Sequence, residues 1–445
     1  MYNAYITTLT NLRKHSNADR LQCTTLFGNN IIVDMSYKEG DRVIFFPTDG
    51  QLGKEFAEEN NLVRKKDAEG NNIGGYLDPE KRNITALKLR GEKSEGLVLP
   101  ITVLSKYIDI NTLSDGDTIS SFGSIVICQK YIPNRKENIF TSTKVSKNRK
   151  NKKTNEYPYF TEHVDTEQLC YNENAFKVGD TCYITLKMHG TSARTANTLQ
   201  ISHKKPNLFQ KVFHLPTKEL KKYVAVSGTR RTVLESFDGG FYGNNAFREQ
   251  YHNFFAKHLP KGMEVYYEIV GYIDNTNTTI MGKCSNSKVK DKEFSKIYGK
   301  ETVFHYGNEI GHSHCYIYRM TMTNEDGYTI ELPWEQVQIE AEKLGCEVVP
   351  TFDKFIFTTW EDLMERVEKY YDGVDPIGLT HIREGVVVRI DNRKSFTAFK
   401  HKNFYFKVLE GIIKDSADTP DMEEIEEIKR NREEGNHDND WKSCI

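Results

Sequence analysis

The segment CYITLKMHGTSAR, from Cys182 to Arg194, constrains the fold and the chemistry of this chain more than any other. Its first half has the apolar alternation of a β-strand. The strand reaches a single lysine, Lys187, and is interrupted at Gly190 before a run of small hydroxylated residues. A lysine at the end of a buried strand is costly unless it has a task. The segment therefore predicts a strand that ends at a functional lysine.

Two interpretations of Lys187 remain open from this segment alone. Burial or a neighbouring cation lowers the pKa of a lysine, and the neutral amine is then a nucleophile. Gly190 would let the backbone approach a ligand, and the hydroxyls of Thr191 and Ser192 are donors of the kind that hold phosphate oxygens. The alternative is a lysine with a buried stem whose ammonium group reaches solvent.

The composition indicates a soluble protein of two or three domains. The chain has 445 residues and a net charge of −2, so any surface that binds nucleic acid must be local. No apolar run approaches the length of a membrane span, and the N-terminus lacks the order of a secretion signal. The eight cysteines form no C-x-x-C pair. We therefore expect a reducing cytoplasmic or nuclear location, no membrane association and no obligate protein partner.

The first part of the chain, residues 1–128, has the rhythm of short strands separated by Asn, Gly and Asp. This rhythm predicts a five-stranded β-barrel of the oligonucleotide/oligosaccharide-binding (OB) type. The run KHSNADRLQ, residues 14–22, resembles the entry of tRNA-binding barrels of that type. The alternative is a plain barrel with a solvated loop. Residues 129–158 are rich in Lys, Arg and Asn and predict a basic linker, which is either a phosphate-binding segment or a simple tether.

Residues 159–408 predict one larger domain of antiparallel sheets with helices on the outer faces. Strand patterns recur along it, and the last one covers FTAFKHKNFYF, residues 396–406. A helix is expected over WEQVQIEAEKLG, with Gly345 as its C-cap, and another over WEDLMERVEKYYDG. The remainder, 409–445, predicts an acidic helix with a disordered end.

Further segments of this domain contain the residue types that a nucleophilic lysine needs. Arginines occur at Arg230 and Arg231, carboxylates at Glu268 and Glu384, and strand tyrosines at Tyr316 and Tyr318, which a regular strand would place on one face. Lys400 and Lys402 are two residues apart and share a side of their strand, with His401 on the other side. Two adjacent cations repel each other, and an anionic ligand such as a triphosphate would relieve that repulsion.

In this order, K-x-H-G, arginine, E-x-x-G, an aromatic residue, E-G and K-x-K resemble the motifs of the covalent nucleotidyltransferases, the superfamily of polynucleotide ligases and capping enzymes. The form KMHGTS is similar to the RNA ligase 2 branch. A barrel ahead of the transferase domain looks like the RNA ligase 5 family. The resemblance implies an α+β fold: an N-terminal OB-type β-barrel, then a covalent nucleotidyltransferase domain of antiparallel sheets with flanking helices.

The resemblance also implies roles for individual residues, with ATP and Mg²⁺ or Mn²⁺ as cofactors. Lys187 would attack the α-phosphorus of ATP to form a lysyl-AMP intermediate. Glu268 and Glu384 would contact the nucleotide and hold the metal, and Tyr318 would stack on adenine, with Tyr316 as the alternative in register. The other implied nucleotide ligands are Thr166, Gln168, His189, Gly190, Arg231, Lys400 and Lys402. Arg230 and Arg231 would contact the nucleic-acid phosphate.

The implied activity is ATP-dependent sealing of a 5′-phosphate end of RNA to a 3′-hydroxyl end, in RNA repair at nicks. Three positions depart from the pattern: Leu186 replaces a frequent glutamate, Ser192 a frequent asparagine, and Arg319 a usual aspartate. They predict a different metal environment. Two alternatives stay open: a GTP-dependent capping guanylyltransferase, and a non-catalytic RNA-binding protein with a degenerate transferase domain.

Overall fold

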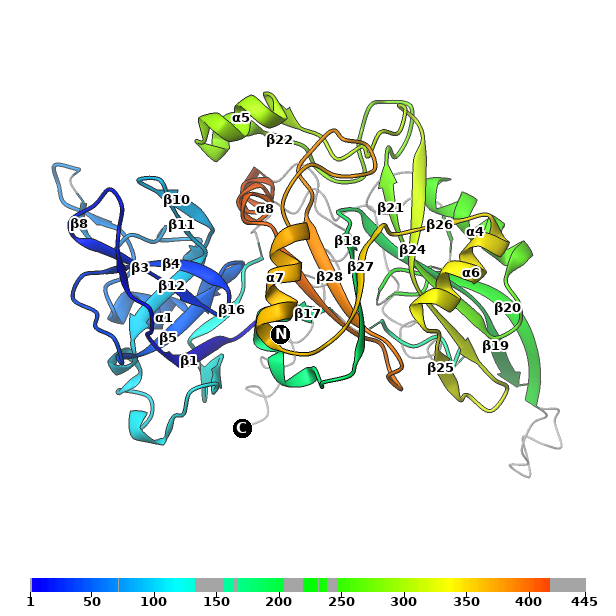
Figure 1. Ribbon diagram of the computed structural model, residues 1–445, viewed down its shortest axis with the longest axis horizontal. Coiled ribbons are helices and arrows are strands. Elements are labelled where there is room, and N and C mark those ends of the chain that lie inside the picture. Colours follow the sequence, from blue (N-terminus) through cyan, green and yellow to red (C-terminus); the bar gives the residue numbers. More distant parts are fainter. Residues whose placement is uncertain are drawn as a thin grey trace, which may run out of the picture. The chain divides into compact units, whose positions relative to one another are not determined.

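The structure is a computed structural model, and it describes residues 2–70, 72–132, 156–163, 166–203, 219–230, 232–234, 236–237 and 246–416. Most of the predicted basic linker, most of the predicted acidic tail, and Arg231 lie outside these ranges. The chain divides into two compact units: the first combines residues 1–134 with 404–417, and the second contains residues 135–403 (Figure 1).

The first unit consists of short strands in small antiparallel sheets. One sheet has the order β12-β5-β1-β13 and another the order β2-β3-β4. Strand β5, RVIFFP, is an almost continuous apolar run because both of its faces are buried. These sheets agree with the predicted β-rich N-terminal region, while the closure of a barrel stays a prediction. The strands and the first helix are β1 (Ala4–Thr8), β2 (Arg13–Lys14), β3 (Leu21–Leu26), β4 (Asn29–Asp34), β5 (Arg42–Pro47), β6 (Gly50–Leu52), α1 (Lys54–Glu59), β7 (Lys65–Lys66), β8 (Asn72–Gly74), β9 (Asn83–Ile84), β10 (Leu87–Leu89), β11 (Glu92–Ser94), β12 (Gly96–Pro100), β13 (Thr118–Ile119), β14 (Ser121–Phe122), β15 (Ile125–Val126) and β16 (Cys128–Lys130).

The second unit contains two larger sheets. The five-stranded sheet has the order β17-β29-β28-β18-β27, and the six-stranded sheet has the order β20-β19-β21-β24-β25 with β26 beside β24. The pairs β17–β29 and β24–β26 are parallel and the other neighbours are antiparallel, as predicted. The strands of this unit are β17 (Glu167–Gln168), β18 (Thr181–Lys187), β19 (Thr191–His203), β20 (Glu219–Gly228), β21 (Met263–Gly271), β22 (Cys284–Ser285), β23 (Glu301–Thr302), β24 (Ser313–Thr323), β25 (Thr329–Glu331), β26 (Glu347–Val348), β27 (Thr351–Ile356), β28 (Gly385–Ile390) and β29 (Thr397–Lys402).

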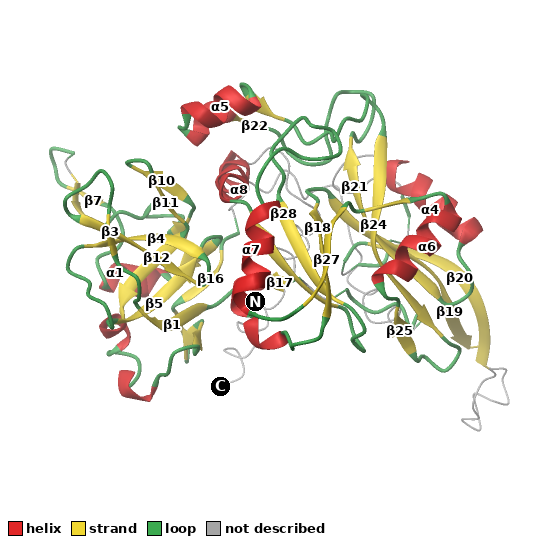
Figure 2. Ribbon diagram, viewed as in Figure 1, coloured by secondary structure: helices red, strands yellow, loops and turns green. Residues whose placement is uncertain are grey.

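Helices lie on the outside of these sheets (Figure 2). Helix α4 (Ala246–His258) packs on β19 and β20, α6 (Trp334–Leu344) on β24, and α7 (Trp360–Tyr370) on β28, while α5 (Lys292–Tyr298) follows the short strand β22. Helix α6 ends at Gly345, whose φ of 68° is the left-handed conformation expected of a glycine C-cap. In the part of the chain that the structure describes, no helix has the length and apolar character needed to cross a membrane.

The end of the second unit differs from the sequence prediction. Strand β29 stops at Lys402, and the aromatic residues expected to continue it begin helix α8 (Phe404–Ser416). The sequence NFYF has high strand propensity, but Phe406 and Leu409 are fully buried at helical spacing. Helix α8 belongs to the first unit, where Lys407 Nζ lies 3.0 Å from Glu95 Oε1 and 3.1 Å from Asn29 Oδ1.

Candidate active site

The predicted lysine lies where the chain passes from one sheet of the second unit to the other. Lys187 is the last residue of β18 in the five-stranded sheet, and Thr191 opens β19 in the six-stranded sheet. Strand β18 forms where it was expected, but Cys182 to Leu186 are all buried between β27 and β28, so both faces of the strand are covered rather than alternate residues only. The intervening residues, 188–190, therefore sit between two sheets, where residues of both can face one pocket.

Lys187 shares a buried carboxylate with the second predicted lysine. Its Nζ lies 2.8 Å from Glu384 Oε1, and Lys402 Nζ lies 3.3 Å from the same oxygen. The side chain of Glu384 is only 2% exposed, against 22% for Lys187 and 14% for Lys402. Such an arrangement concentrates two amines around one anion, where a phosphate group could compete for them.

Glu268 and Glu384 both contact the turn that follows Lys187. His189 Nδ1 lies 3.9 Å from Glu384 Oε2, and the Gly190 N–H donates to Glu268 Oε1 at 3.2 Å. A Cβ on Gly190 would lie 2.4 Å from the carbonyl oxygen of Ile269, so a side chain does not fit there. Gly190 does allow a close approach, as the sequence predicted. The group that lies close to it is the backbone of strand β21, whereas the prediction was a ligand.

A buried tyrosine, not anticipated from the sequence, holds the same turn. The backbone N–H of His189 donates to Tyr306 Oη at 2.7 Å. Burial raises the pKa of the Tyr306 phenol well above its usual value, so the group stays neutral. Its signal in the sequence was weak, because an isolated tyrosine in a loop has no periodic pattern.

Tyr318 reaches the site through a break in the pairing of β24. Tyr266 pairs with Arg319 and Tyr267 pairs with Ile317, which leaves Tyr318 as the extra residue of a bulge. The regular alternation used to place Tyr316 and Tyr318 on one face is therefore wrong. Tyr316 is buried, whereas Tyr318 lines the pocket and its Oη lies 3.1 Å from Ser192 Oγ.

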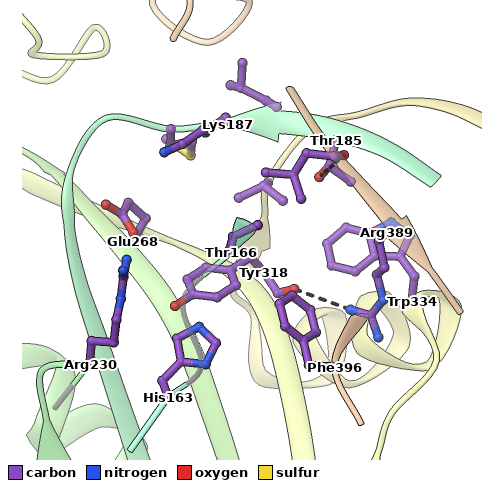
Figure 3. A pocket seen from close by; sticks show the side chains of 14 residues that line it. His163, Thr166, Thr185, Lys187, Arg230, Glu268, Tyr318, Trp334, Arg389 and Phe396 are labelled. Atoms are coloured by element: carbon purple, nitrogen blue, oxygen red, sulfur yellow. Dashed lines mark hydrogen bonds between the residues drawn. The ribbon is translucent and has the colours of Figure 1, made fainter. Parts of the chain in front are cut away.

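Lys187, Glu268 and Tyr318 line a pocket of about 680 Å³, a volume that includes space open to solvent. Figure 3 shows the charged ends of Lys187, Glu268 and Arg230 on one side and the rings of Tyr318, His163 and Phe396 on another. The pocket thus offers cations and carboxylates beside aromatic faces. Its lining residues are His163, Thr166, Thr185, Leu186, Lys187, Met188, Arg230, Glu268, Tyr318, Trp334, Val349, Val387, Arg389 and Phe396.

Some predicted site residues lie elsewhere or were assigned the wrong contacts. Gln168 and Lys400 face each other in the β17–β29 ladder, and neither is among the described residues that line the pocket. The side chain of Lys402 is mostly buried, not exposed as expected, and its ammonium group is paired with the Glu384 carboxylate. The hydroxyls of Thr191 and Ser192 are buried, so they do not face a phosphate as expected. Helix α4 instead holds Thr191, because Arg248 Nη2 donates to its Oγ1.

Arg319, which stands where the family pattern usually has an aspartate, belongs to a buried ionic group beside the pocket. Arg319 donates to both oxygens of Glu331, with Nε 3.0 Å from each and Nη2 2.8 Å from Oε2. Burial alone would lower the pKa of Arg319, and hydrogen bonding to the Glu331 carboxylate helps raise it above the usual value. Arg389, another residue the sequence did not single out, donates to the Tyr318 carbonyl at 3.5 Å (Figure 3).

The predicted metal ligands suit a metal site that the protein and the substrate phosphates form together. Among the described residues, no three His, Cys, Asp or Glu side chains form a cluster that could hold a metal ion. Magnesium and manganese are often held by one or two carboxylates together with substrate phosphates. Glu268, at the pocket wall, and Glu384, beside Lys187, fit that requirement.

Two mostly antiparallel sheets that flank a pocket with a strand-end lysine, carboxylates and an aromatic ring define a nucleotidyltransferase fold. The sequence pattern of the RNA ligase family matches residues 180–409, which is more than half of the chain. The chain belongs to the RNA ligase family. No curated protein matches it in sequence.

Solved structures agree at the level of the fold. A Naegleria gruberi RNA ligase variant with ATP and Mn is 16% identical, with a TM-score of 0.57 over 91% of this chain and 98% of that chain. A variant of the same ligase with AMP and Mn is 16% identical, with a TM-score of 0.55 over 91% and 97%. The form with PPi is 17% identical, with a TM-score of 0.55 over 90% and 96%.

These comparisons confirm the expected α+β nucleotidyltransferase fold and the RNA ligase family, and they do not favour a capping enzyme or a degenerate domain. Membership of the RNA ligase 5 branch stays a prediction.

Proposed function

We propose that this protein seals RNA ends in three steps, through an AMP group carried on Lys187. The observation that carries the proposal is the sharing of Glu384 by Lys187 and Lys402 at a pocket that also presents Tyr318. The Naegleria ligases with ATP and Mn support ATP and a divalent cation as cofactors.

In the first step, the Lys187 amine attacks the α-phosphorus of ATP. An N–P bond forms, the bond from that phosphorus to the pyrophosphate oxygen breaks, and the amine loses its proton. An oxygen of an RNA 5′-phosphate then attacks the AMP phosphorus, which releases Lys187. Finally the 3′-hydroxyl attacks the activated 5′-phosphate, and AMP leaves as the strands join.

The ion pair of Lys187 with Glu384 must break before the amine can attack, so it represents a resting arrangement. We propose that the nucleotide phosphates draw Lys402 away, and that Glu384 turns from Lys187 to other cations. Mg²⁺ or Mn²⁺, held by Glu384 and Glu268, would neutralise charge on the phosphate oxygens. Glu268 also fixes the turn at Gly190, so it positions the residues that follow the nucleophile.

The aromatic side of the pocket suits a nucleobase. Stacking on an aromatic side chain contributes about 1–3 kcal/mol per base in other nucleic-acid-binding proteins. Tyr318 is held for this role by Ser192 and by its bulge in β24. Thr166 and Arg230 line the same pocket and are our candidates for contacts with the nucleotide and the RNA phosphate. We retain His189, Gln168, Lys400 and Arg231 as further candidates from the sequence pattern.

The first unit is the proposed RNA-binding module, on the basis of its β-rich organisation and the KHSNADRLQ run. We also propose action in the cytoplasm or nucleus without an obligate protein partner. The described cysteines that have free thiols, Cys23, Cys128, Cys170, Cys182, Cys284, Cys315 and Cys346, are compatible with a reducing compartment.

Labelling with ATP that carries radioactive phosphorus at the α position tests the proposal. We expect an acid-stable label on the protein that Lys187→Ala abolishes. Lys354→Ala is the matched control, because Lys354 is an exposed lysine of β27 in the same sheet. Label from GTP alone would favour a capping enzyme, and no label from either nucleotide would favour a binding protein. Chase of the label into a nicked RNA duplex would complete the assignment.

A further inference from the structure

Beside Tyr318, the pocket wall carries a histidine whose protonation is dictated by an arginine. His163 is 7% exposed and lines the pocket. Its Nδ1 lies 2.8 Å from Nη1 of Arg319. A guanidinium group has five N–H donors and no acceptor, so Nδ1 must be the acceptor and carries no proton. A neutral imidazole without a proton on Nδ1 carries it on Nε2.

The arginine is anchored independently of the histidine. Its guanidinium lies 4.3 Å from the ring centre of Tyr266 and 4.8 Å from that of Phe396. Both oxygens of Glu331 accept hydrogen bonds from it, and its side chain is 11% exposed. These hydrogen bonds and ring contacts hold Arg319 in place, and its positive charge disfavours a second proton on His163.

The imidazole ring is equally constrained. Its centre lies 4.9 Å from Tyr266, 5.8 Å from Tyr318 and 5.9 Å from Phe396. The His163 backbone N–H donates to the Arg230 carbonyl at 2.9 Å. Figure 3 shows the His163 ring beside Tyr318 on the pocket wall. The two ring nitrogens point in diverging directions, so the Nε2 edge is turned away from Arg319.

We propose that Arg319 fixes His163 as an Nε2–H donor, and that this donor selects the base by bonding to a ring nitrogen of adenine. The proposal rests on the proposed function, because it names the base-reading group of that same pocket. A ring nitrogen of adenine is an acceptor and offers a neutral N–H its natural partner. The donor lies beside the ring on which we expect the base to stack. Arg319, which occupies the position of the expected aspartate, acts only through His163 and is a positioning residue.

The protonation state can be measured without any nucleotide. Nitrogen NMR of the full chain with ¹⁵N-labelled histidine should show one imidazole with its proton on Nε2 and none on Nδ1 near neutral pH. His163→Gln should remove that signal and so assign it. In the double variant Arg319→Met with Glu331→Gln, which leaves no isolated buried charge, the signal should become a mixture of protonation states. A charged imidazole or a proton on Nδ1 in the wild type would overturn the proposal, as would an unchanged signal in the double variant.

Base selection is measured by the rate of label transfer to Lys187 from ATP and from 1-deaza-, 3-deaza- and 7-deaza-ATP, each of which lacks one ring nitrogen. The wild type should be roughly 2- to 10-fold slower with one analogue, the effect of one neutral hydrogen bond. His163→Ala should use ATP and that analogue equally, and His163→Gln, which keeps an N–H, should recover part of the difference. Phe396→Leu, which removes packing but no hydrogen bond, should slow all four nucleotides alike.

The outcomes separate this inference from the proposed function. A wild type that distinguishes none of the analogues, or a His163→Ala variant that still distinguishes them as the wild type does, would overturn the base-reading role while ligation stands. A wild type that takes label from no nucleotide would overturn the proposed function and the base-reading role together. The NMR measurement would then still show whether Arg319 sets the proton on His163.

Discussion

Glu384 supplies the negative charge that pairs with both lysines of the candidate site. It is almost completely buried, and its Oε1 is within 3.3 Å of two lysine amines. Removing one member of a buried ionic group is more costly than removing the whole group, because the remaining charges lose their partner. Here the remaining charges would be two ammonium groups that repel each other.

Glu384→Gln keeps the shape of this side chain and removes its charge. We expect the rate of lysyl-AMP formation to fall by roughly 100-fold or more, in the range seen when a preorganised electrostatic group is lost. The free energy of unfolding should fall by about 1–3 kcal/mol, less than for a fully buried pair because Lys187 is partly exposed. Label transfer and urea unfolding measure the two effects.

The control for Glu384→Gln is Glu335→Gln, which breaks the exposed pair with Lys354. Exposed pairs contribute little, so neither the rate nor the stability should change measurably. A Glu384→Gln enzyme that forms lysyl-AMP within a factor of two of the wild type would contradict the central role given to this carboxylate.

At the scale of elements, one buried aspartate joins the five-stranded sheet to helix α6. Asp391 follows directly after β28, and its Oδ2 accepts the N–H of Trp334, the first residue of α6, at 2.7 Å. Its Oδ1 accepts from Arg389 Nε at 2.6 Å. A carboxylate at a helix N-terminus satisfies an amide without an intrahelical partner and interacts favourably with the helix dipole. Helix α6 in turn packs on β24, the strand that carries Tyr318.

Asp391→Ala should therefore loosen α6 and leave the buried Arg389 with only the more distant carboxylate of Glu331, 3.9 Å from its Nη2. We expect the free energy of unfolding to decrease by about 2–4 kcal/mol. Asp391→Asn keeps an oxygen for Trp334 and should lose less. Thermal unfolding followed by circular dichroism ranks the two variants, and equal losses would show that the Trp334 contact contributes nothing.

The elements also show how far the sequence could be interpreted. The strand-end lysine, the antiparallel sheets of the second unit and the glycine that ends α6 were predictable, because each depends on a local pattern. The bulge at Tyr318 was not, because alternation assumes an unbroken register between β21 and β24. The pairing of Arg319 with His163 was also hidden, since it joins residues 156 positions apart in the chain.

At the scale of the whole molecule, the first unit is completed by a segment from the far end of the described chain. In helix α8, Lys407 is paired with Glu95, whose side chain is 6% exposed. Burial would raise the pKa of Glu95, but the charge and the hydrogen bond of Lys407 help hold it below the usual value. The pair thus stabilises the attachment of α8 at neutral pH.

Lys407→Met should leave Glu95 as a buried charge and destabilise the first unit by about 2–4 kcal/mol. The double variant with Glu95→Gln should recover part of this loss, because neither charge then remains. Hydrogen exchange of the β3–β4 and β11 amides in the full chain measures the effect. If the double variant were no more stable than Lys407→Met, the two side chains would not act as a pair.

The first unit should also lose stability in acid through Glu92. Hydrogen bonds from Arg13, at 2.9 Å and 3.2 Å, and from Ser16 lower the pKa of Glu92 from its usual 4.5 to about 2. A carboxylate whose pKa is lower in the folded state stabilises the fold above its unfolded pKa, and this contribution disappears as the pH falls toward 2. Urea midpoints recorded across this range should fall less steeply for Glu92→Gln. A slope identical to that of the wild type would show that the Arg13 contact does not form.

The division of the chain has a consequence for its synthesis. A ribosome completes residues 1–134 early, yet α8 emerges only after the entire RNA ligase unit has been made. The first unit therefore stays incomplete until α8 has been translated. A premature stop anywhere before Phe404 would therefore remove α8 from the first unit as well as truncate the second unit.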